Sequence, residues 1–210
     1  MLFSPAMVSA LLDGSKTQTR RIFDGYTPPD CPGAHTCIVE DGWAKFHLDG
    51  KLSTRGGEWT KCPHTVGSFI WVREEHWAYG LWKKNGRSET GRQKWKFRRD
   101  KMITEARFET SNESPFLKTD VGWYKRLARF MFRRDSRITL EVTGVKIEKL
   151  NDISEADAKA EGCQPSPPAM AAVQLPYRNA YRMLWESIHG TGSWARNDWV
   201  WTYTFRRVWP

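Results

Sequence analysis

The stretch "SRITLEVTGVKIEKL" (Ser136–Leu150) is the longest segment of the chain with the pattern of a β-strand. Its apolar residues alternate up to a glycine and then resume, as Ile138, Leu140 and Val142 before Gly144 and Val145 and Ile147 after it. Alternation with period two indicates a strand with one buried face. A glycine inside such a pattern is typical of a bulge or a bend. The segment therefore predicts one long strand that is interrupted near Gly144.

Helices are predicted on both sides of this strand. Ser4 precedes a proline, and the apolar face that follows ends at Gly14, which predicts a first helix. After the long strand, "SEADAKAEG" carries Ser154 as an N-cap, Asp157 at the reciprocal capping position and Gly162 as the end of a short helix. A third helix is predicted for "YRNAYRMLWESIHG", whose apolar stripe we interpret as core: Tyr177, Tyr181, Leu184, Trp185 and Ile188.

Three further strands complete the predicted fold. They are "TQTRRI" (17–22), "SFIWVREEHWA" (Ser68–Ala78) and the closing "DWVWTYTFRRV", with loops and a short hairpin expected between Asp24 and Thr65. Strands that outnumber helices, in this order, predict an α+β fold: a small, mostly antiparallel β-barrel with flanking helices. We expect residues 1–210 to form a single domain with a long basic insertion at about 79–135.

The positive charge of the chain is concentrated in one window. The formal net charge is +9, and residues 83–137 hold 17 Lys and Arg against 7 Asp and Glu. Aromatic rings are interspersed there, and a basic face with aromatic rings is typical of nucleic-acid binding. The predicted nucleic-acid contacts are Lys94, Lys96, Arg98 and Arg99. The competing interpretation is a solvated insertion that charge keeps soluble.

The remaining composition indicates a cytoplasmic protein. The N-terminus lacks the pattern of a signal peptide, and no segment has the run of about 20 apolar residues that crosses a bilayer. We therefore expect no membrane association and reduced cysteines. A zinc site is conceivable at Cys31, Cys37, Cys62 and His64 or His35, but the separations match no short Cys-x-x-Cys pair. No metal and no cofactor is predicted.

The segment "GSKTQTRR" (Gly14–Arg21) offers candidate catalytic residues. A corner between helix and strand lets Lys16 and Thr19 converge, and a lysine beside a hydroxyl is a usable nucleophile pair when its amine is partly desolvated. Glu161 stands at the end of the short helix, where the helix dipole disfavours a carboxylate and a raised pKa would suit proton exchange. The competing interpretation is that these are ordinary exposed strand residues.

Five segments together resemble the ASCH domain of the PUA-like superfamily, in the enlarged form common in bacteriophages and prophages. They are "LFSPAMVSALLDGSKTQTRRI", "GSFIWVREEHWA", "SRITLEVTGVKIEKLNDISEADAKAEG", "YRNAYRMLWESIHG" and "DWVWTYTFRRV", which cover about two-thirds of the chain in the family's order. The resemblance implies a small β-barrel with a cleft that acts on RNA or nucleotides. If the chain is phage-encoded, its location is the host cytoplasm.

The small bacterial members similar to this chain are N4-acetylcytidine amidohydrolases. Their Lys-x-x-Thr pair falls on Lys16 and Thr19, and their glutamate falls on Glu161. The resemblance thus implies a hydrolase with these three catalytic residues. The residues expected to bind substrate are Arg20, Arg21, Arg73 and Glu74. Residues 79–135 have no counterpart in the small amidohydrolases.

Three functions remain open from the sequence. The first is an amidohydrolase that removes an acyl group from N4-acylated cytosine or cytidine. The second is a non-catalytic module that binds RNA or modified DNA through phosphate contacts and stacking rings. The third is a ribonuclease, in which Lys16 would stabilise a phosphorane-like transition state. The expected partner is in each case a nucleoside, RNA or single-stranded nucleic acid.

Overall fold

The chain folds into two compact units. A computed structural model describes residues 1–23, 35–40, 42–48, 51–52, 60–108, 115, 117–165 and 175–208. Unit 1 comprises Met1–Pro5 and Trp71–Arg137, and unit 2 comprises Ala6–Ile70 and Ile138–Pro210. The described residues form a mixed α+β structure in which most paired strands are antiparallel, as the sequence predicts. The basic segment at about 79–135 lies inside unit 1.

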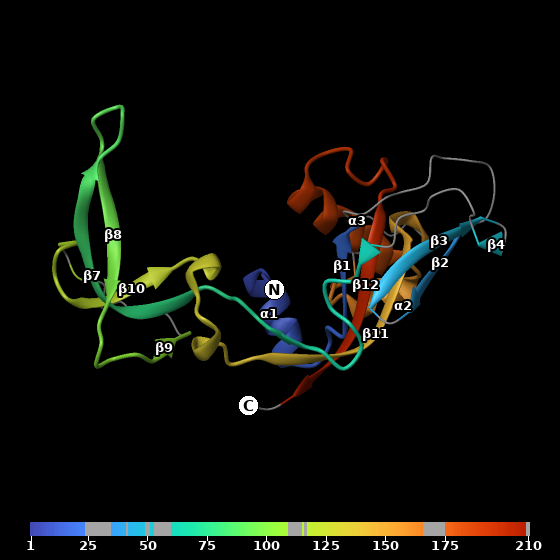
Figure 1. Ribbon diagram of the computed structural model, residues 1–210, viewed down its shortest axis with the longest axis horizontal. Coiled ribbons are helices and arrows are strands. Elements are labelled where there is room, and N and C mark those ends of the chain that lie inside the picture. The colour runs from blue at the N-terminus through green and yellow to red at the C-terminus, as the bar shows by residue number, and fades with distance from the viewer. Residues whose placement is uncertain are drawn as a thin grey trace. The chain divides into compact units, whose positions relative to one another are not determined.

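The main sheet of unit 2 has four strands in the order β1-β12-β11-β6. Their bounds are Gln18–Ile22 for β1, Trp199–Val208 for β12, Thr139–Lys149 for β11 and Phe69–Trp71 for β6. β12 pairs antiparallel with β1 on one side and with β11 on the other, so the closing strand is central (Figure 1). The sheet curls like part of a barrel.

The interruption predicted at Gly144 is confirmed. β11 opposes β12 with Val142 facing Phe205 and Gly144 facing Thr204, so one residue of β11 is left over between these pairs. A bulge of this kind bends a strand and increases its twist. Apolar residues on both sides of the bulge are nevertheless buried, because the twisted strand continues along the core.

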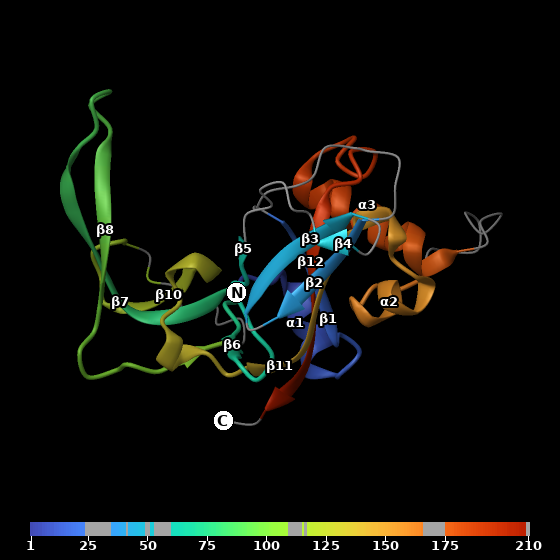
Figure 2. The ribbon, with the colours of Figure 1, turned by 45° about the vertical axis from the view of Figure 1, so that its right-hand side comes forward.

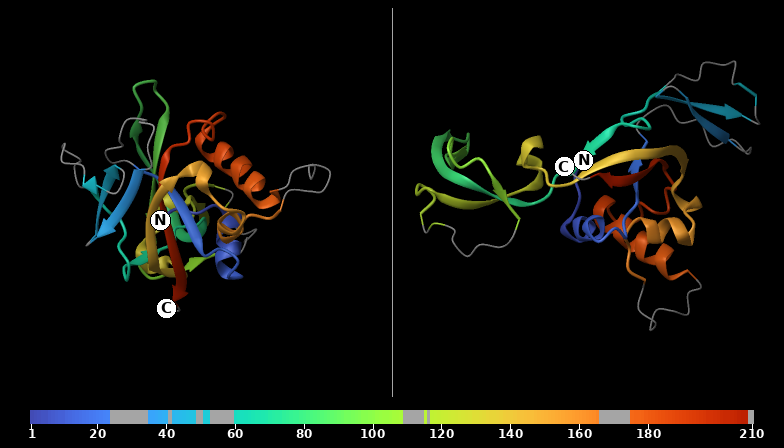
Figure 3. Two further views of the ribbon diagram at one scale, coloured as in Figure 1. Left: turned by 90° about the vertical axis from the view of Figure 1, so that its right-hand side faces the viewer. Right: turned by 90° about the horizontal axis from the view of Figure 1, so that it is seen from below.

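The helices of the described chain are α1 (Pro5–Leu12), α2 (Glu155–Ala160) and α3 (Pro176–His189), with the 3₁₀ turn η3 at Leu150–Asp152. The predicted cap of α2 is confirmed, since the Ser154 side chain accepts a hydrogen bond of 3.0 Å from the Asp157 amide. Figure 3 shows α2 and α3 on one side of the β11–β12 pair and the β2–β3 hairpin on the other. Within the described residues, no helix is long and apolar enough to cross a membrane.

A hydrophobic cluster joins α2 and α3 to the main sheet. Its buried members are Leu150, Ile153, Ala158, Tyr181, Trp185 and Val200. The core prediction is confirmed for Tyr181 and Trp185, which are each 3% exposed. It is wrong for Ile188, which is 56% exposed, because α3 presents only the first three turns of its apolar stripe to the sheet.

A second sheet of unit 2 contains the predicted hairpin. β2 (His35–Glu40) and β3 (Trp43–Leu48) pair antiparallel, and β3 also pairs with β4 (Lys51–Leu52) and β5 (Thr60–Lys61). Figure 2 shows this hairpin lying in front of β11 and β12, and β2 contacts β11. The other segments of the predicted loop region, at residues 24–34 and 53–59, lie outside the described residues.

Unit 1 is built on a twisted antiparallel sheet in the order β10-β7-β8, with β9 also paired to β7. The bounds are His76–Arg87 for β7, Gln93–Arg99 for β8, Ala106–Arg107 for β9 and Gly122–Arg126 for β10. Two 3₁₀ turns follow, η1 at Ala128–Phe130 and η2 at Arg133–Asp135. Trp82, Phe97 and Tyr124 contact one another edge to face, with ring centroids 5.4–6.4 Å apart, and form the aromatic centre of the unit.

The single strand predicted at Ser68–Ala78 is wrong, because the structure divides it into β6 and the start of β7. The chain between them is held by other partners. Arg73 forms an isolated parallel bridge with Leu2, and the Glu74 carboxylate accepts two hydrogen bonds from Arg137. These long-range contacts replace the regular ladder that a continuous strand would need.

We predict that Trp185→Ala lowers the free energy of unfolding by about 3–5 kcal/mol, as expected for a truncated buried aromatic side chain. Ile188→Ala, on the same helix but exposed, should change it by no more than about 0.5 kcal/mol. Urea unfolding of both variants measures these two changes in the free energy of unfolding. Equal effects would show that α3 does not bury its Trp185 face.

Candidate functional site

The corner after α1 places Lys16 beside the end of α2. The helix ends at Leu12, Gly14 adopts a left-handed φ of 82°, and the Lys16 amide bonds to the Ala10 carbonyl at 2.9 Å. Lys16 and Glu161 then form an isolated antiparallel bridge. Residues 145 positions apart in sequence are thus brought together by their backbones.

The Lys16 ammonium is enclosed by hydrogen-bond acceptors. Its Nζ donates to Glu161 Oε2 at 2.7 Å, to the Glu161 carbonyl at 2.8 Å and to the Gln18 carbonyl at 2.8 Å. The Lys16 side chain is 0% exposed and that of Glu161 is 2% exposed. A buried ion pair persists only when its donors and acceptors are satisfied in this way.

Gly162 makes the close approach of α2 to the corner possible. It has a φ of 81°, and a Cβ on it would lie 2.8 Å from the Ala10 Cβ and 3.0 Å from the Lys16 Cβ. Both the backbone conformation and the space therefore favour glycine. The sequence signal for a helix end at Gly162 thus also fixes where Glu161 sits.

Arg20 extends the ion pair into a network of carboxylates. Its Nη1 donates to Glu161 Oε1 at 3.1 Å, and its Nε and Nη2 donate to Glu148 Oε1 at 3.0 and 2.7 Å. Asp157 lies 3.5 Å from Nη2, and Thr202 and Lys146 also bond to Glu148 at 2.8 Å each. Glu161 is therefore shared between two buried cations.

Burial and charge shift several pKa values at this site. Burial lowers the pKa of Lys16, and the charge of Glu161 opposes that change only in part. For Arg20 burial also acts to lower the pKa, but Glu161 and Glu148 outweigh it and the pKa is raised. Burial raises the pKa of the Cys163 thiol to about 11 and that of Tyr181 well above its ordinary value. A lysine amine loses its proton more readily when its pKa is lowered, which favours a role in proton transfer.

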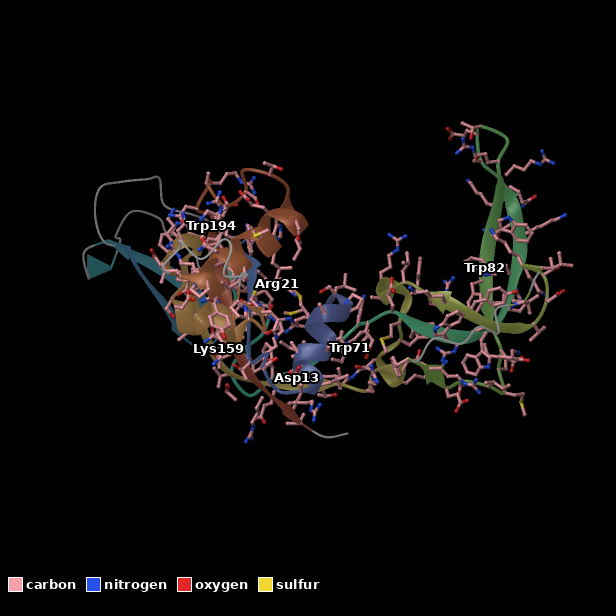
Figure 4. The ribbon with its side chains drawn as sticks, turned by 180° about the vertical axis from the view of Figure 1, so that it is seen from behind. Asp13, Arg21, Trp71, Trp82, Lys159 and Trp194 are labelled. Atoms are coloured by element: carbon pink, nitrogen blue, oxygen red, sulfur yellow. The ribbon has the colours of Figure 1, made fainter. Side chains whose placement is uncertain are left out.

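Thr19 lies in β1 directly before Arg20 and, by strand alternation, faces the opposite side of the sheet from it. It is 1% exposed, and its Oγ1 accepts a hydrogen bond from Arg21 Nη1 at 3.0 Å. The same nitrogen donates to the Arg20 carbonyl at 2.8 Å. Figure 4 labels Arg21. The described contacts therefore place Thr19 with Arg21, and Lys16 with Glu161 and Arg20.

The other two residues expected to bind substrate, Arg73 and Glu74, belong to unit 1. The Arg73 guanidinium lies 4.4 Å from the centroid of the Trp71 ring, and Glu74 pairs with Arg137 at 2.9 Å. The four residues predicted to contact nucleic acid lie on β8. Lys94, Lys96 and Arg98 are exposed, whereas Arg99 pairs with Asp135.

Glu148 and Asp157 are members of the network that the sequence pattern does not reveal. Glu148 comes from β11, next to β12 and one strand removed from β1, and Asp157 comes from α2. In the sequence both look like surface carboxylates. The available signal was Arg20 itself, because a buried guanidinium requires carboxylate partners, yet only the strand order shows which carboxylates face it.

Among the described residues, no three His, Cys, Asp or Glu side chains gather closely enough to hold a metal ion. Two members of the conceivable zinc set have described side chains. Cys62 is buried and donates to the His64 carbonyl at 3.0 Å, and the His64 ring packs edge-on against Tyr203. Cys31 and the side chains of Cys37 and His35 lie outside the described residues.

No protein-family model, no curated protein and no solved structure matches the chain.

We predict that Glu148→Gln flattens the acid branch of the stability curve. Burial alone would raise the pKa of Glu148, but its hydrogen bond from Lys146 and the charge of Arg20 lower it overall. The folded state thus releases this proton more readily than the unfolded state. The resulting stability is present above an unfolded pKa of about 4.3 and is lost as the pH falls through the folded pKa.

The control is Glu141→Gln, on the same strand, where Glu141 pairs with the exposed Arg206 at 2.8 Å. Urea unfolding between about pH 3 and 6 should show a weaker pH dependence for Glu148→Gln than for the control, since exposed pairs contribute only about 0–1 kcal/mol. Identical pH dependence in the two variants would show that the ion pairs of Glu148 do not contribute to stability.

Proposed function

We propose that this chain is a cytoplasmic PUA-like ASCH protein that hydrolyses the acyl amide of N4-acylated cytosine or cytidine. The observation that carries the proposal is the 2.7 Å contact between Lys16 Nζ and Glu161 Oε2. These are the two residues that the resemblance matches to the lysine and the glutamate of the amidohydrolases. The lowered pKa of Lys16, which burial causes, supports a role in proton transfer.

The proposed chemistry requires one proton to move within the ion pair. When it passes from Lys16 Nζ to the Glu161 carboxylate, the pair becomes a neutral amine and a carboxylic acid. The step requires Thr19 Oγ1, which accepts a hydrogen bond from Arg21 in the structure, to come within hydrogen-bond reach of Lys16 Nζ when substrate binds. The amine then takes the proton of the Thr19 hydroxyl as Oγ1 attacks the acyl carbonyl. Glu161 gives its proton to N4 as the C–N bond breaks, which leaves an acyl ester on Thr19.

Water then hydrolyses the ester, with water as the nucleophile and the Thr19 oxygen as the leaving group. Lys16, again neutral after the same proton shift, takes a proton from the attacking water, and Glu161 returns a proton to Thr19 Oγ1. In this proposal Arg21 polarises the acyl carbonyl. The support for this role is the hydrogen bond of 3.0 Å that its Nη1 donates to Thr19 Oγ1. Arg20 acts as a positioning residue, since it binds Glu161 and Glu148 together.

One observation favours a second candidate, a non-catalytic module that binds RNA or modified DNA. All three N–H groups of the Lys16 ammonium have acceptors in the structure. An ammonium that is fully satisfied and buried is also what a structural ion pair looks like. Under this alternative the network holds the corner in place, and nucleic acid binds without turnover.

The Thr19 hydroxyl distinguishes these candidates with little risk to the fold. Thr19→Val keeps the β-branched shape and removes the nucleophile, whereas Thr19→Ser keeps a hydroxyl. We expect the wild-type protein and Thr19→Ser to release acetate from N4-acetylcytidine. Thr19→Val should lose at least about 100-fold in kcat, the lower end of what positioned proton transfer contributes.

The same preparations are incubated with labelled RNA to follow binding and strand cleavage. RNA binding without deacylation by the wild-type protein would overturn the amidohydrolase proposal in favour of the binding module. Strand cleavage that Thr19→Val retains and Lys16→Met loses would favour a ribonuclease. Equal deacylation by Thr19→Val and Thr19→Ser would exclude Thr19 as the nucleophile.

A further inference from the structure

Unit 1 contains a cavity of about 620 Å³. This volume lies within the range of about 300–1,000 Å³ that is usual for small-molecule sites. The lining side chains come from β7, β8, β10, η1 and the segments that flank them. Five of them are Lys or Arg and five are Trp or Phe, and none of the described lining residues is Asp or Glu. The cavity is therefore both cationic and aromatic.

Most of these cations have no carboxylate partner within the described part of the chain. Arg99 is the exception, because it forms an ion pair with Asp135 and also donates to the Thr104 and Glu105 carbonyls. The cations without a described carboxylate are Arg73, Lys96, Arg126 and Arg129. In addition, the Arg73 Nε is buried and lacks a hydrogen-bond partner among the described residues. Four cations without a described carboxylate partner around one cavity favour an anionic ligand.

Arg126 shows how the cavity combines charge with rings. Its guanidinium lies 4.4 Å from the centroid of Phe97, 4.7 Å from that of Trp82 and 4.8 Å from that of Phe130. Figure 4 labels Trp82 at this position. Burial lowers the pKa of Arg126, but a guanidinium stays charged in proteins. The rings hold the guanidinium in place while its N–H groups remain available to an acceptor.

The rim of the cavity carries rings that the fold leaves open to solvent. Phe130 is 47% exposed and Phe132 is 55% exposed. Neither ring belongs to the edge-to-face cluster of Trp82, Phe97 and Tyr124 that forms the aromatic centre of the unit. Exposed rings beside a cationic cavity are suited to stack on the flat face of a ligand.

From these features we infer that the unit 1 cavity binds a nucleobase with its attached phosphate. The four cations without a described carboxylate partner bind the phosphate oxygens, and Phe130 or Phe132 stacks on the base. An acidic peptide would satisfy the charges but would leave the rings without a flat partner. The site does not depend on the chemistry at Lys16, because every residue that forms it belongs to unit 1.

A nucleobase with its attached phosphate occurs both in a free nucleotide and in a nucleotide within a single strand. Both are tested by fluorescence anisotropy competition with the full-length protein. The competitors are cytidine monophosphate, adenosine monophosphate, an eight-nucleotide single strand, an abasic strand of the same length and poly-glutamate. We expect at least one base-containing competitor to bind at least about fivefold more tightly than the abasic strand and poly-glutamate, since stacking of one base contributes about 1–3 kcal/mol.

The relative affinities of the competitors show whether the ligand is a free nucleotide or a single strand. A single strand should also show an affinity that falls with salt, with a logarithmic slope of about −0.7 for each phosphate contacted. A monophosphate that binds as tightly as the strand would identify a free nucleotide as the ligand. Equal binding of the base-containing, abasic and poly-glutamate competitors would overturn the inference, because only charge would then be recognised.

Matched variants locate the site. Lys94 and Lys96 are both exposed on β8, but only Lys96 lines the cavity. Lys96→Gln should therefore weaken binding more than Lys94→Gln. Phe130→Ala should weaken it at least about fivefold by removing a stacking ring, whereas Leu127→Ala, which truncates a nearby exposed apolar residue, should not. Equal effects within each pair would contradict the assignment to this cavity.

Discussion

The ion pair between Lys16 and Glu161 is the interaction on which the arrangement of unit 2 depends. It connects the corner after α1 to the end of α2, and Arg20 extends it to Glu148 on β11. Placing these charges in the interior is costly, and each is compensated by hydrogen bonds at 3.1 Å or less. The buried charged groups of the corner, of α2 and of the sheet therefore all find hydrogen-bond partners in this one arrangement.

The two units handle positive charge in different ways. In unit 2 the buried cations meet carboxylates, as Arg20 does with Glu148 and Glu161. In unit 1 the guanidinium groups more often lie against rings, as Arg126 does with Trp82, Phe97 and Phe130. Rings stabilise a cation without neutralising it. A guanidinium such as that of Arg126 therefore keeps its full charge, whereas the buried cations of unit 2 are paired with carboxylates.

Local signals in the sequence were sufficient for much of this structure. The bulge at Gly144 and the cap at Ser154 are properties of short segments, and both are confirmed. The resemblance implied one site for Lys16, Thr19 and Glu161, and the corner was expected to bring Lys16 and Thr19 together. The structure pairs Lys16 with Glu161, whereas the Thr19 hydroxyl is paired with Arg21. The partners of Arg20 were not expected, because they depend on strand order. The division of the strand at Ser68–Ala78 likewise results from contacts with residues far away, at Leu2 and Arg137.

A double-mutant cycle on Lys16 and Glu161 tests the central claim most directly. Lys16→Met and Glu161→Gln should each lower the free energy of unfolding by about 3–5 kcal/mol. The first leaves the buried Glu161 carboxylate with Arg20 alone, and the second leaves the buried Lys16 ammonium without a carboxylate partner. The double variant should lose clearly less than the sum of the two losses, with a coupling energy of about 1–3 kcal/mol. Additive losses, within about 0.5 kcal/mol, would show that the pair does not hold the corner to α2.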